Sequence, residues 1–442
     1  MIHDPSRRPD DRAFLDARRP AASQRPTGAH PRIPRVARRD PHAMTNRPST
    51  VLASAVFGAA LALPAAALAA PQNYTIVDLS TLAGPYTWFD PGSVATSVSR
   101  GAVVGHSVSG QDDRAVHAIR AVNGAITDLG TLPGDQHSMA FASNPAGDAV
   151  GISYVAGDVD VHGVLWPWAG GMISLGSIEP HDIAADGAIA GSIPFTGGVA
   201  GAAGTMHACL RIGATTTDIG TLGGPSSMGL ALNENHWVVG DSMLADNRTT
   251  HAFVWRNGAM LDLGTLGGAG SRAVDIDGLT VVGFADILGT RAHAVRWVLN
   301  EAGGIVSKTD LGTLGGSVTS AAFAVHGDTV VGSSNDRAVL WNASGIVDLN
   351  TLIDAKSYWV LTKAIGIDSA GRIVGVGRHK GLTRAFVMVP QIPADLDGDG
   401  IVGAADLAIL LGAWGSTDPQ LDLNHDGSVN APDVAILLGA WT

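Results

Sequence analysis

Two twelve-residue segments near the end of the chain, 395–406 and 422–433, carry oxygen-bearing side chains at matching positions. Positions 1, 3, 5 and 12 are acidic in the first segment, and asparagine replaces the acid at position 3 of the second. Calcium is a hard cation that takes roughly six to eight oxygen ligands, and this spacing arranges them around one ion. Gly400 and Gly427, at position 6, permit the sharp turn that such a loop needs. The two segments therefore predict two Ca²⁺ ions.

Each ion is expected to take side chains from positions 1, 3, 5 and 12 and the backbone carbonyl of position 7. The expected ligands are Asp395, Asp397, Asp399, Ile401 and Asp406 in the first segment, and Asp422, Asn424, Asp426, Ser428 and Asp433 in the second. The alternative is an acidic, glycine-rich linker, but chance duplication does not explain the near-identical apolar nonamers 406–414 and 433–441. Residues 395–442 contain no Lys or Arg, so their carboxylates repel one another until a cation binds.

The duplicated loops, the matching nonamers and the Asp at position 12, where an EF-hand has a longer Glu, resemble a type I dockerin. The resemblance implies two antiparallel helices and binding to a cohesin-like protein through a helix face. The residues expected at this face are Ala404, Ala405, Leu407, Leu411, Ala431, Val434 and Leu438. Loop positions 10 and 11 depart from the family, since they hold Ala404–Ala405 and Ala431–Pro432 where well-known cohesin binders often carry Ser-Thr-like pairs.

Three short elements recur seven times between residues 71 and 390. One ends in V-V-G or a variant of it, at Gly105, Gly151, Gly191, Gly240, Gly283, Gly332 and Gly375. One is centred on Ala118, Gly163, Ala208, Ala252, Ala294, Ala338 and Ala385. The third reads D-L-G-T-L or a variant of it, beginning at Asp78, Asp128, Ser174, Asp218, Asp262, Asp310 and Asp348. The period of about 44 residues matches one four-stranded blade of a β-propeller.

The two ends of the array are complementary, because the seventh unit lacks its outer strand and the first unit begins with an extra one at 74–79. Pairing these ends closes a ring and leaves no open sheet edge. The sequence thus predicts an all-β, seven-bladed β-propeller followed by a small α-helical module. The repeats resemble the HAF family, through His251-Ala252-Phe253 and the D-L-G-T-L-G-G run at 262–268. That resemblance implies a secreted propeller-like domain and no defined activity.

Residues 44–69 read as a secretory signal peptide, with an apolar stretch and an A-x-A cleavage site at 67–69. An uncleaved membrane anchor is the alternative, but Pro64 and the alanine-rich end favour cleavage, so we expect no membrane span in the mature chain. The expected organisation is a disordered leader or misassigned start at 1–43, the signal peptide at 44–69, the repeats at 70–389, a linker at 390–394 and the calcium module at 395–442. A secreted or cell-surface location follows.

Histidines at one phase of the repeat are expected to be structural hydrogen-bonding residues, because catalysis needs unlike neighbours in one pocket. No catalytic residue is assigned, and Cys209 is expected to be a buried thiol. Aromatic insertions in units one and seven, which are neighbours in a closed ring, predict a polysaccharide-binding platform. They are Tyr86, Trp88, Asp90, Tyr358 and Trp359. The alternative is that these aromatic residues pack the ring closure.

The net charge of −12 makes nucleic acid an unfavourable partner. Together these features predict a secreted calcium-binding protein that is docked or anchored through its C-terminal module, with the propeller as a binding or structural module. The rival interpretation is a propeller-based polysaccharide hydrolase or lyase in an extracellular complex. A glycosidase of this kind needs two carboxylates across a cleft, and the sequence alone gives no such distance.

Overall fold

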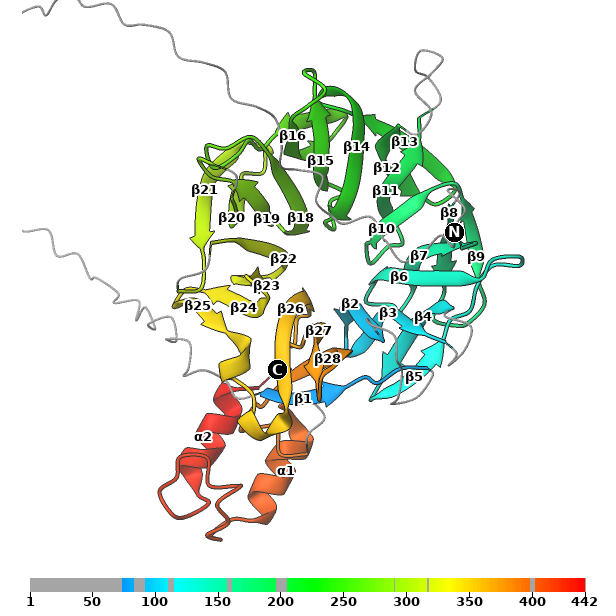
Figure 1. The fold of residues 1–442 in the computed structure, drawn as a ribbon. Helices are drawn as coiled ribbons and strands as arrows, with labels where there is room; N and C mark the ends of the chain where they lie inside the picture. Colours follow the sequence, from blue (N-terminus) through cyan, green and yellow to red (C-terminus); the bar gives the residue numbers. More distant parts are fainter. Residues whose placement is uncertain are drawn as a thin grey trace, which may run out of the picture. The chain divides into compact units, whose positions relative to one another are not determined.

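The computed structural model describes residues 74–82, 92–109, 115–156, 161–195, 205–289, 291–315, 318–397 and 402–441. Most of these residues form a ring of seven antiparallel sheets, each with four strands (Figure 1). The protein is therefore an all-β, seven-bladed β-propeller, as its repeats predict. The leader, the signal peptide, Tyr86, Trp88, Asp90, Asp399 and Ile401 lie outside the described residues.

The first six blades follow the chain in order, each as a four-stranded meander. The strands of the first three blades are β2 (Ser93–Ser99), β3 (Ala102–Val108), β4 (Val116–Val122), β5 (Ala125–Asp128), β6 (His137–Ser143), β7 (Ala149–Tyr154), β8 (Val161–Trp166), β9 (Ile173–Gly176), β10 (Glu179–Ile183), β11 (Ile189–Pro194), β12 (Met206–Ile212) and β13 (Thr215–Gly220). The strands of the next three are β14 (Gly223–Leu232), β15 (Val238–Leu244), β16 (Thr250–Arg256), β17 (Ala259–Asp262), β18 (Ser271–Asp277), β19 (Thr280–Asp286), β20 (Ala292–Leu299), β21 (Ile305–Gly312), β22 (Ser320–His326), β23 (Thr329–Ser334), β24 (Arg337–Asn342) and β25 (Gly345–Asp348).

The seventh blade combines both ends of the array. Its inner strands are β26 (Trp359–Ile367), β27 (Ile373–His379) and β28 (Leu382–Pro390), and its outermost strand is β1 (Tyr74–Asp78). The pairing of β1 with β28 is antiparallel and runs from Tyr74 opposite Pro390 to Asp78 opposite Phe386. Two short 3₁₀ helices, η1 (Leu349–Thr351) and η2 (Ala355–Ser357), connect the sixth blade to the seventh. The predicted closure of the ring by the N-terminal strand is confirmed.

The repeated V-V-G glycine is explained by a β-bulge on the innermost strand of every blade. In the fifth blade the register shifts between Ala273 and Asp275, opposite Gly283. A Cβ on Gly283 would lie 2.0 Å from the carbonyl oxygen of Arg272, which no real contact permits. The bulge and the glycine therefore occur together, because only a residue without a side chain lets the bulged strand approach so closely.

The hydrophobic core is divided among the interfaces between consecutive blades. Trp297 of the fifth blade is fully buried in a cluster with Val254 and Leu263 of the fourth, and its indole N–H donates to the Leu263 carbonyl over 3.0 Å. Buried serines link the same interfaces: the Ser271 hydroxyl accepts from the Ala252 N–H at 2.9 Å and donates to the Gly264 carbonyl at 2.8 Å. These contacts fix each D-L-G loop against the following blade.

The C-terminal module contains two α-helices, α1 (Ala404–Gly412) and α2 (Ala431–Gly439). Each begins at an N-cap residue whose backbone N–H donates to an Asp at the third helical position. The module's own core includes Val402, Leu410, Val429 and Leu437, all fully buried. Within the part of the chain that the structure describes, no helix has the length and apolar character needed to cross a membrane.

Candidate metal centre and other candidate sites

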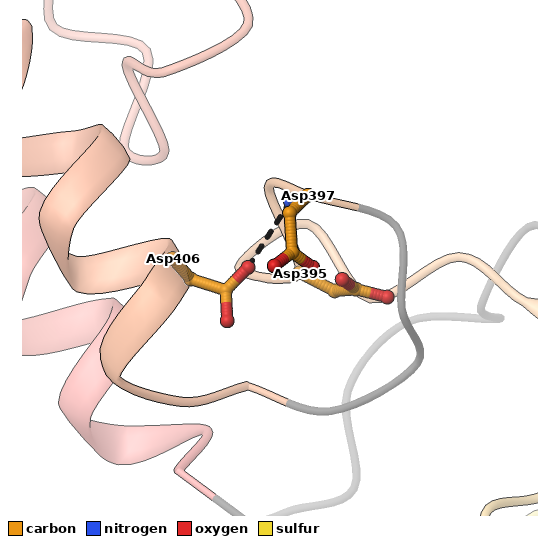
Figure 2. A group of neighbouring side chains, drawn as sticks. All are labelled: Asp395, Asp397 and Asp406. Carbon is orange, nitrogen blue, oxygen red and sulfur yellow. Dashed lines mark hydrogen bonds between the residues drawn. The ribbon is translucent and has the colours of Figure 1, made fainter.

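Three carboxylates meet just before α1. One oxygen each from Asp395, Asp397 and Asp406 lies within 4.8 Å of the others, and Figure 2 shows Asp406 entering from the helix while the other two project from the loop. Oδ1 of Asp406 accepts from the N–H of Asp397 at 3.1 Å, and Oδ2 accepts from the N–H of Gly403 at 2.7 Å. Burial raises the pKa of Asp406, but these backbone donors outweigh it and hold the pKa below its usual range.

The second loop repeats the hydrogen bonds to the helix carboxylate at the equivalent positions, although its described acidic residues do not bring three carboxylates together as the first loop does. Oδ1 of Asp433 accepts from the N–H of Asn424 at 3.1 Å, and Oδ2 accepts from the N–H of Asn430 at 2.7 Å. The first loop residue, Asp422, accepts from the N–H groups of Asp426 and Gly427 at 3.1 and 2.7 Å. Hydrogen bonds from the Asn424 and Asn430 side chains lower the pKa of Asp426. Both loops are thus organised around a carboxylate that enters from the following helix.

The donor set fits a hard divalent cation. All expected side-chain ligands are carboxylates apart from Asn424, and oxygen is the ligand type that Ca²⁺ prefers. Three carboxylates within 4.8 Å repel one another, and residues 395–442 supply no cationic side chain to offset that repulsion. A bound cation would add to the compensation that backbone N–H groups already give Asp406. The expected assignment of ligands to two Ca²⁺ ions stays a prediction.

The residues predicted to contact a partner divide into two groups. Ala404, Ala405 and Ala431 are exposed, as are the equivalent leucines Leu411 and Leu438. Leu407 and Val434, by contrast, pack against the module's core, which makes them less suitable as contact residues. The structure also exposes large apolar side chains that the sequence analysis did not select, namely Ile409, Trp414, Ile436 and Trp441. A two-helix module is too small to bury every apolar residue of the nonamers 406–414 and 433–441. This size limit was the sequence signal that could have pointed to the four exposed residues.

The predicted aromatic platform is described only at Tyr358 and Trp359. Tyr358 has a positive φ of 60° and is 71% exposed. Trp359 is buried and stacks on the His379 ring, with centroids 4.8 Å apart. Trp359 therefore packs within the closing blade, which is the role that the alternative interpretation gives it. Because Tyr86, Trp88 and Asp90 lie outside the described residues, the polysaccharide platform stays a prediction.

The histidines of the repeat pair with aspartates of the same blade. Nδ1 of His117 lies 2.7 Å from Asp128, and His207, His251 and His293 make equivalent contacts with Asp218, Asp262 and Asp310. Each of these aspartates also accepts an N–H two residues further along, as Asp262 does from Gly264 at 2.7 Å. The pair therefore ties the third strand to the turn that follows the fourth. Cys209 is fully buried and burial raises its pKa to about 12, so it is no thiolate nucleophile.

The centre of the ring contains a cavity of about 440 Å³ lined by the innermost strands of all seven blades. Four carboxylates line it, and the sequence analysis missed all of them: Asp182 from β10, Glu234 from the β14–β15 turn, and Asp275 and Asp277 from β18. Asp182 and Asp275 each accept an N–H from the innermost strand of the next blade: Leu232 donates to Asp182 at 3.0 Å and Val325 to Asp275 at 2.8 Å. Burial raises the pKa of Asp182 to about 6 and that of Asp275 to about 7, and the charge of Asp182 adds to the second shift.

The seven sheets and the closing strand define the protein as a seven-bladed β-propeller with a C-terminal pair of helices. No protein-family model matches the chain, and no curated protein matches it. Among solved structures, TolB from Acinetobacter baumannii is 12% identical with a TM-score of 0.40, over 68% of this chain and 67% of that one. The β-propeller domain of the Trilobed protease from Pyrococcus furiosus is 10% identical with a TM-score of 0.46, over 67% and 95%. A streptogramin B lyase is 12% identical with a TM-score of 0.42, over 72% and 98%.

Proposed function

We propose that this protein is an exported, calcium-dependent tethered propeller, in which the C-terminal module binds two Ca²⁺ ions and docks to a partner at the cell surface or in an extracellular complex. The observation that carries the proposal is the meeting of Asp395, Asp397 and Asp406 within 4.8 Å. The matching backbone hydrogen bonds to Asp433 in the second loop support a second ion. The resemblance of this module to a type I dockerin supports docking to a cohesin-like protein.

The exposed apolar residues of both helices support a docking role. Leu411 and Leu438 occupy equivalent positions and are about half exposed, at 49% and 52%. Half-exposed apolar side chains at equivalent positions of both helices give a partner an apolar surface to cover. The propeller then serves as the displayed binding or structural domain, in keeping with its resemblance to the extracellular HAF repeats. Calcium acts by compensating the loop carboxylates, which orders the helices that carry the docking face.

Calcium-dependent retention on the parent organism's cell envelope tests this function. The tagged full chain is incubated with envelope and with concentrated medium, in calcium and in chelator. We expect retention in calcium alone, and its loss in an Asp395→Ala, Asp422→Ala double variant. Asp418→Ala is the matched control, because Asp418 lies between the loops and its Oδ1 accepts only from the nearby Gln420 N–H. Equal retention of wild type and the double variant would refute the docking role.

A further inference from the structure

The interface between the seventh and first blades contains a second cavity, of about 580 Å³. Both blades supply its apolar walls. These walls include Val77, Leu79, Val387 and Val389 of the closing blade and Val103 and Ala121 of the first. A volume of this size lies within the range of sites for small organic molecules, which are mostly apolar and carry a few polar groups at defined places.

The cavity coincides with a missing tryptophan. On the third strand of four blades, a tryptophan lies opposite a small or β-branched residue of the second strand: Trp166 opposite Ala149, Trp255 opposite Val238, Trp297 opposite Val281 and Trp341 opposite Val330. In the first blade the same register pairs Ala121 with Val103. The third and seventh blades place Arg211 and Met388 there. Ala121 is therefore the smallest of the seven side chains at this position.

The position of Trp297 shows which contacts Ala121 does not make. Trp297 packs against the preceding blade and donates its indole N–H to the Leu263 carbonyl. The residue equivalent to Leu263 in the closing blade is Leu79, which follows Asp78 as Leu263 follows Asp262. Leu79 lines the cavity together with Ala121. The seam of the ring thus lacks the aromatic side chain that four other blades have here, and Leu79 and Ala121, each 2% exposed, form the closely packed floor of the cavity.

Two arginines lie at this cavity, Arg100 from the β2–β3 turn and Arg372 from the β26–β27 turn. The Arg372 guanidinium packs on Gly101, whose ideal Cβ position is 3.6 Å from Cζ, and its Nη1 lies 3.4 Å from Oδ2 of Asp368. Arg100 is exposed and has no hydrogen-bond or ion-pair partner among the described residues. One carboxylate against two guanidinium groups leaves a net positive charge beside an apolar cavity.

We propose that this seam cavity binds a small aromatic carboxylate. Its planar ring lies in the cavity against the half-buried Val77 and Val389, and its carboxylate pairs with Arg100 and Arg372. A guanidinium presents several N–H donors in a plane and is suited to a carboxylate, while its face stacks on aromatic rings. The chain already uses such stacking, with Arg256 over the Trp237 ring at 4.9 Å and Arg120 over Trp168 at 5.1 Å.

The ligand would contact both ends of the propeller. Val77 and Leu79 belong to the segment that begins with β1, and Ala121 belongs to the first blade of the meander. Binding therefore stabilises the closed ring, because a ligand that binds the native state and not the unfolded chain raises the unfolding temperature. This readout is independent of the C-terminal module and of its calcium.

Calorimetric titration of the full chain with indole-3-propionate tests the proposal, because this probe combines an indole with a carboxylate on a short chain. We expect saturable binding with a raised unfolding temperature, and affinity about tenfold weaker for the neutral indole-3-propanamide. Arg100→Gln is expected to weaken binding of the acid by about tenfold and to leave the amide unaffected. Arg378→Gln, an exposed arginine on β27 that does not line the cavity, is the matched control.

A variant that places a large side chain at the cavity provides the second part of the test. Ala121→Trp supplies the indole that four other blades have, at the floor of the cavity, so we expect loss of probe binding. If this variant does not fold, Ala121→Leu narrows the cavity with a smaller change in volume. No saturable binding to the wild type at millimolar probe would overturn the proposal. So would binding that persists unchanged in the folded Ala121 variants or is equal for the acid and the amide.

Discussion

Oδ2 of Asp78 lies 2.7 Å from Nδ1 of His379, although 301 residues separate them in the sequence. In the equivalent pairs of the first, third, fourth and fifth blades the histidine belongs to the third strand, whereas His379 is the last residue of β27, the second strand of its blade. The equivalent third-strand position in the closing blade holds Arg384. The second strand, β27, thus supplies a histidine where the third strand has none. Asp78, the last residue of β1, therefore keeps a histidine–aspartate contact like those of the other four blades.

This pair should contribute to closure of the ring. In a double-mutant cycle with Asp78→Ala and His379→Ala, we expect a coupling free energy of about 0.5–1 kcal/mol in urea unfolding, because the pair is partly exposed. The cycle for His293 and Asp310, a similar pair in the fifth blade, is the matched control and should give a similar value. A coupling energy of zero at the seam and not in the control would show that Asp78 and His379 do not act together.

The close approach at the inner bulge makes the V-V-G glycine intolerant of substitution. Gly283→Ala places a Cβ 2.0 Å from the Arg272 carbonyl oxygen, so we expect a loss of about 2–4 kcal/mol in the free energy of unfolding. Gly315→Ala is the control, since no atom lies within 4 Å of its ideal Cβ position. Denaturant unfolding of both variants measures the difference. Equal free energies of unfolding for Gly283→Ala and Gly315→Ala would contradict this expectation, because the bulge would then accommodate the Cβ without loss of stability.

The channel carboxylates should make stability depend on pH. The pKa of Asp275 rises from 3.8 to about 7 on folding, so the native state binds the proton more tightly than the unfolded chain. Stability from this group is present below about pH 4 and is lost as the pH rises towards 7. One pKa unit corresponds to about 1.4 kcal/mol, and water in the channel reduces the effect, so we expect about 1–2 kcal/mol.

Unfolding free energies measured from pH 4 to pH 7 in wild type and Asp275→Asn give this contribution as a difference. The comparison is needed because His181, whose pKa burial lowers to about 4, changes stability in the opposite direction over this range. Asp328→Asn, an exposed aspartate in the β22–β23 turn, is the control. The same pH dependence in wild type and Asp275→Asn would contradict the assignment.

The docking face should be separable from calcium binding. Leu411→Asp with Leu438→Asp puts charge at two equivalent, half-exposed positions, and we expect envelope retention to fall at least about tenfold with calcium affinity unchanged. Leu288→Asp, at an exposed leucine of the propeller, is the control for a general effect of added charge. Retention that is unaffected by the double substitution would exclude this face as the docking site.

The repeats predicted the propeller because each unit carries its own strand and turn signals at a constant period. Closure by β1 was also predictable, since the missing strand of the last unit matched the extra strand of the first. The contact of His379 with Asp78 was not predictable, because His379 belongs to the second strand and not to the third, where four other blades have their histidine. Only the register of the folded sheet brings it near Asp78. Asp182 and Asp275 were missed for a similar reason: they face the channel only because a bulge rotates the strand at those positions.

The two candidate calcium loops stand out in the sequence because their expected ligands are local and duplicated. The seam cavity was not recognised, although aligning Ala121 with Trp166, Trp255, Trp297 and Trp341 would have shown the missing indole. That alignment reveals a smaller side chain but not the empty space, since a neighbour in space can fill such a gap. In the structure the neighbours cover Ala121, and the cavity opens beside it, between the two blades.

Calcium titration of the full chain by calorimetry is the most direct test of the central claim. We expect two ions per chain, with dissociation constants of roughly 10⁻⁴ to 10⁻⁶ M. Asp395→Ala is expected to remove one ion and the Asp395→Ala, Asp422→Ala double variant both, while Asp418→Ala keeps two. Absence of calcium binding by the wild type, or two ions still bound by the double variant, would contradict the account.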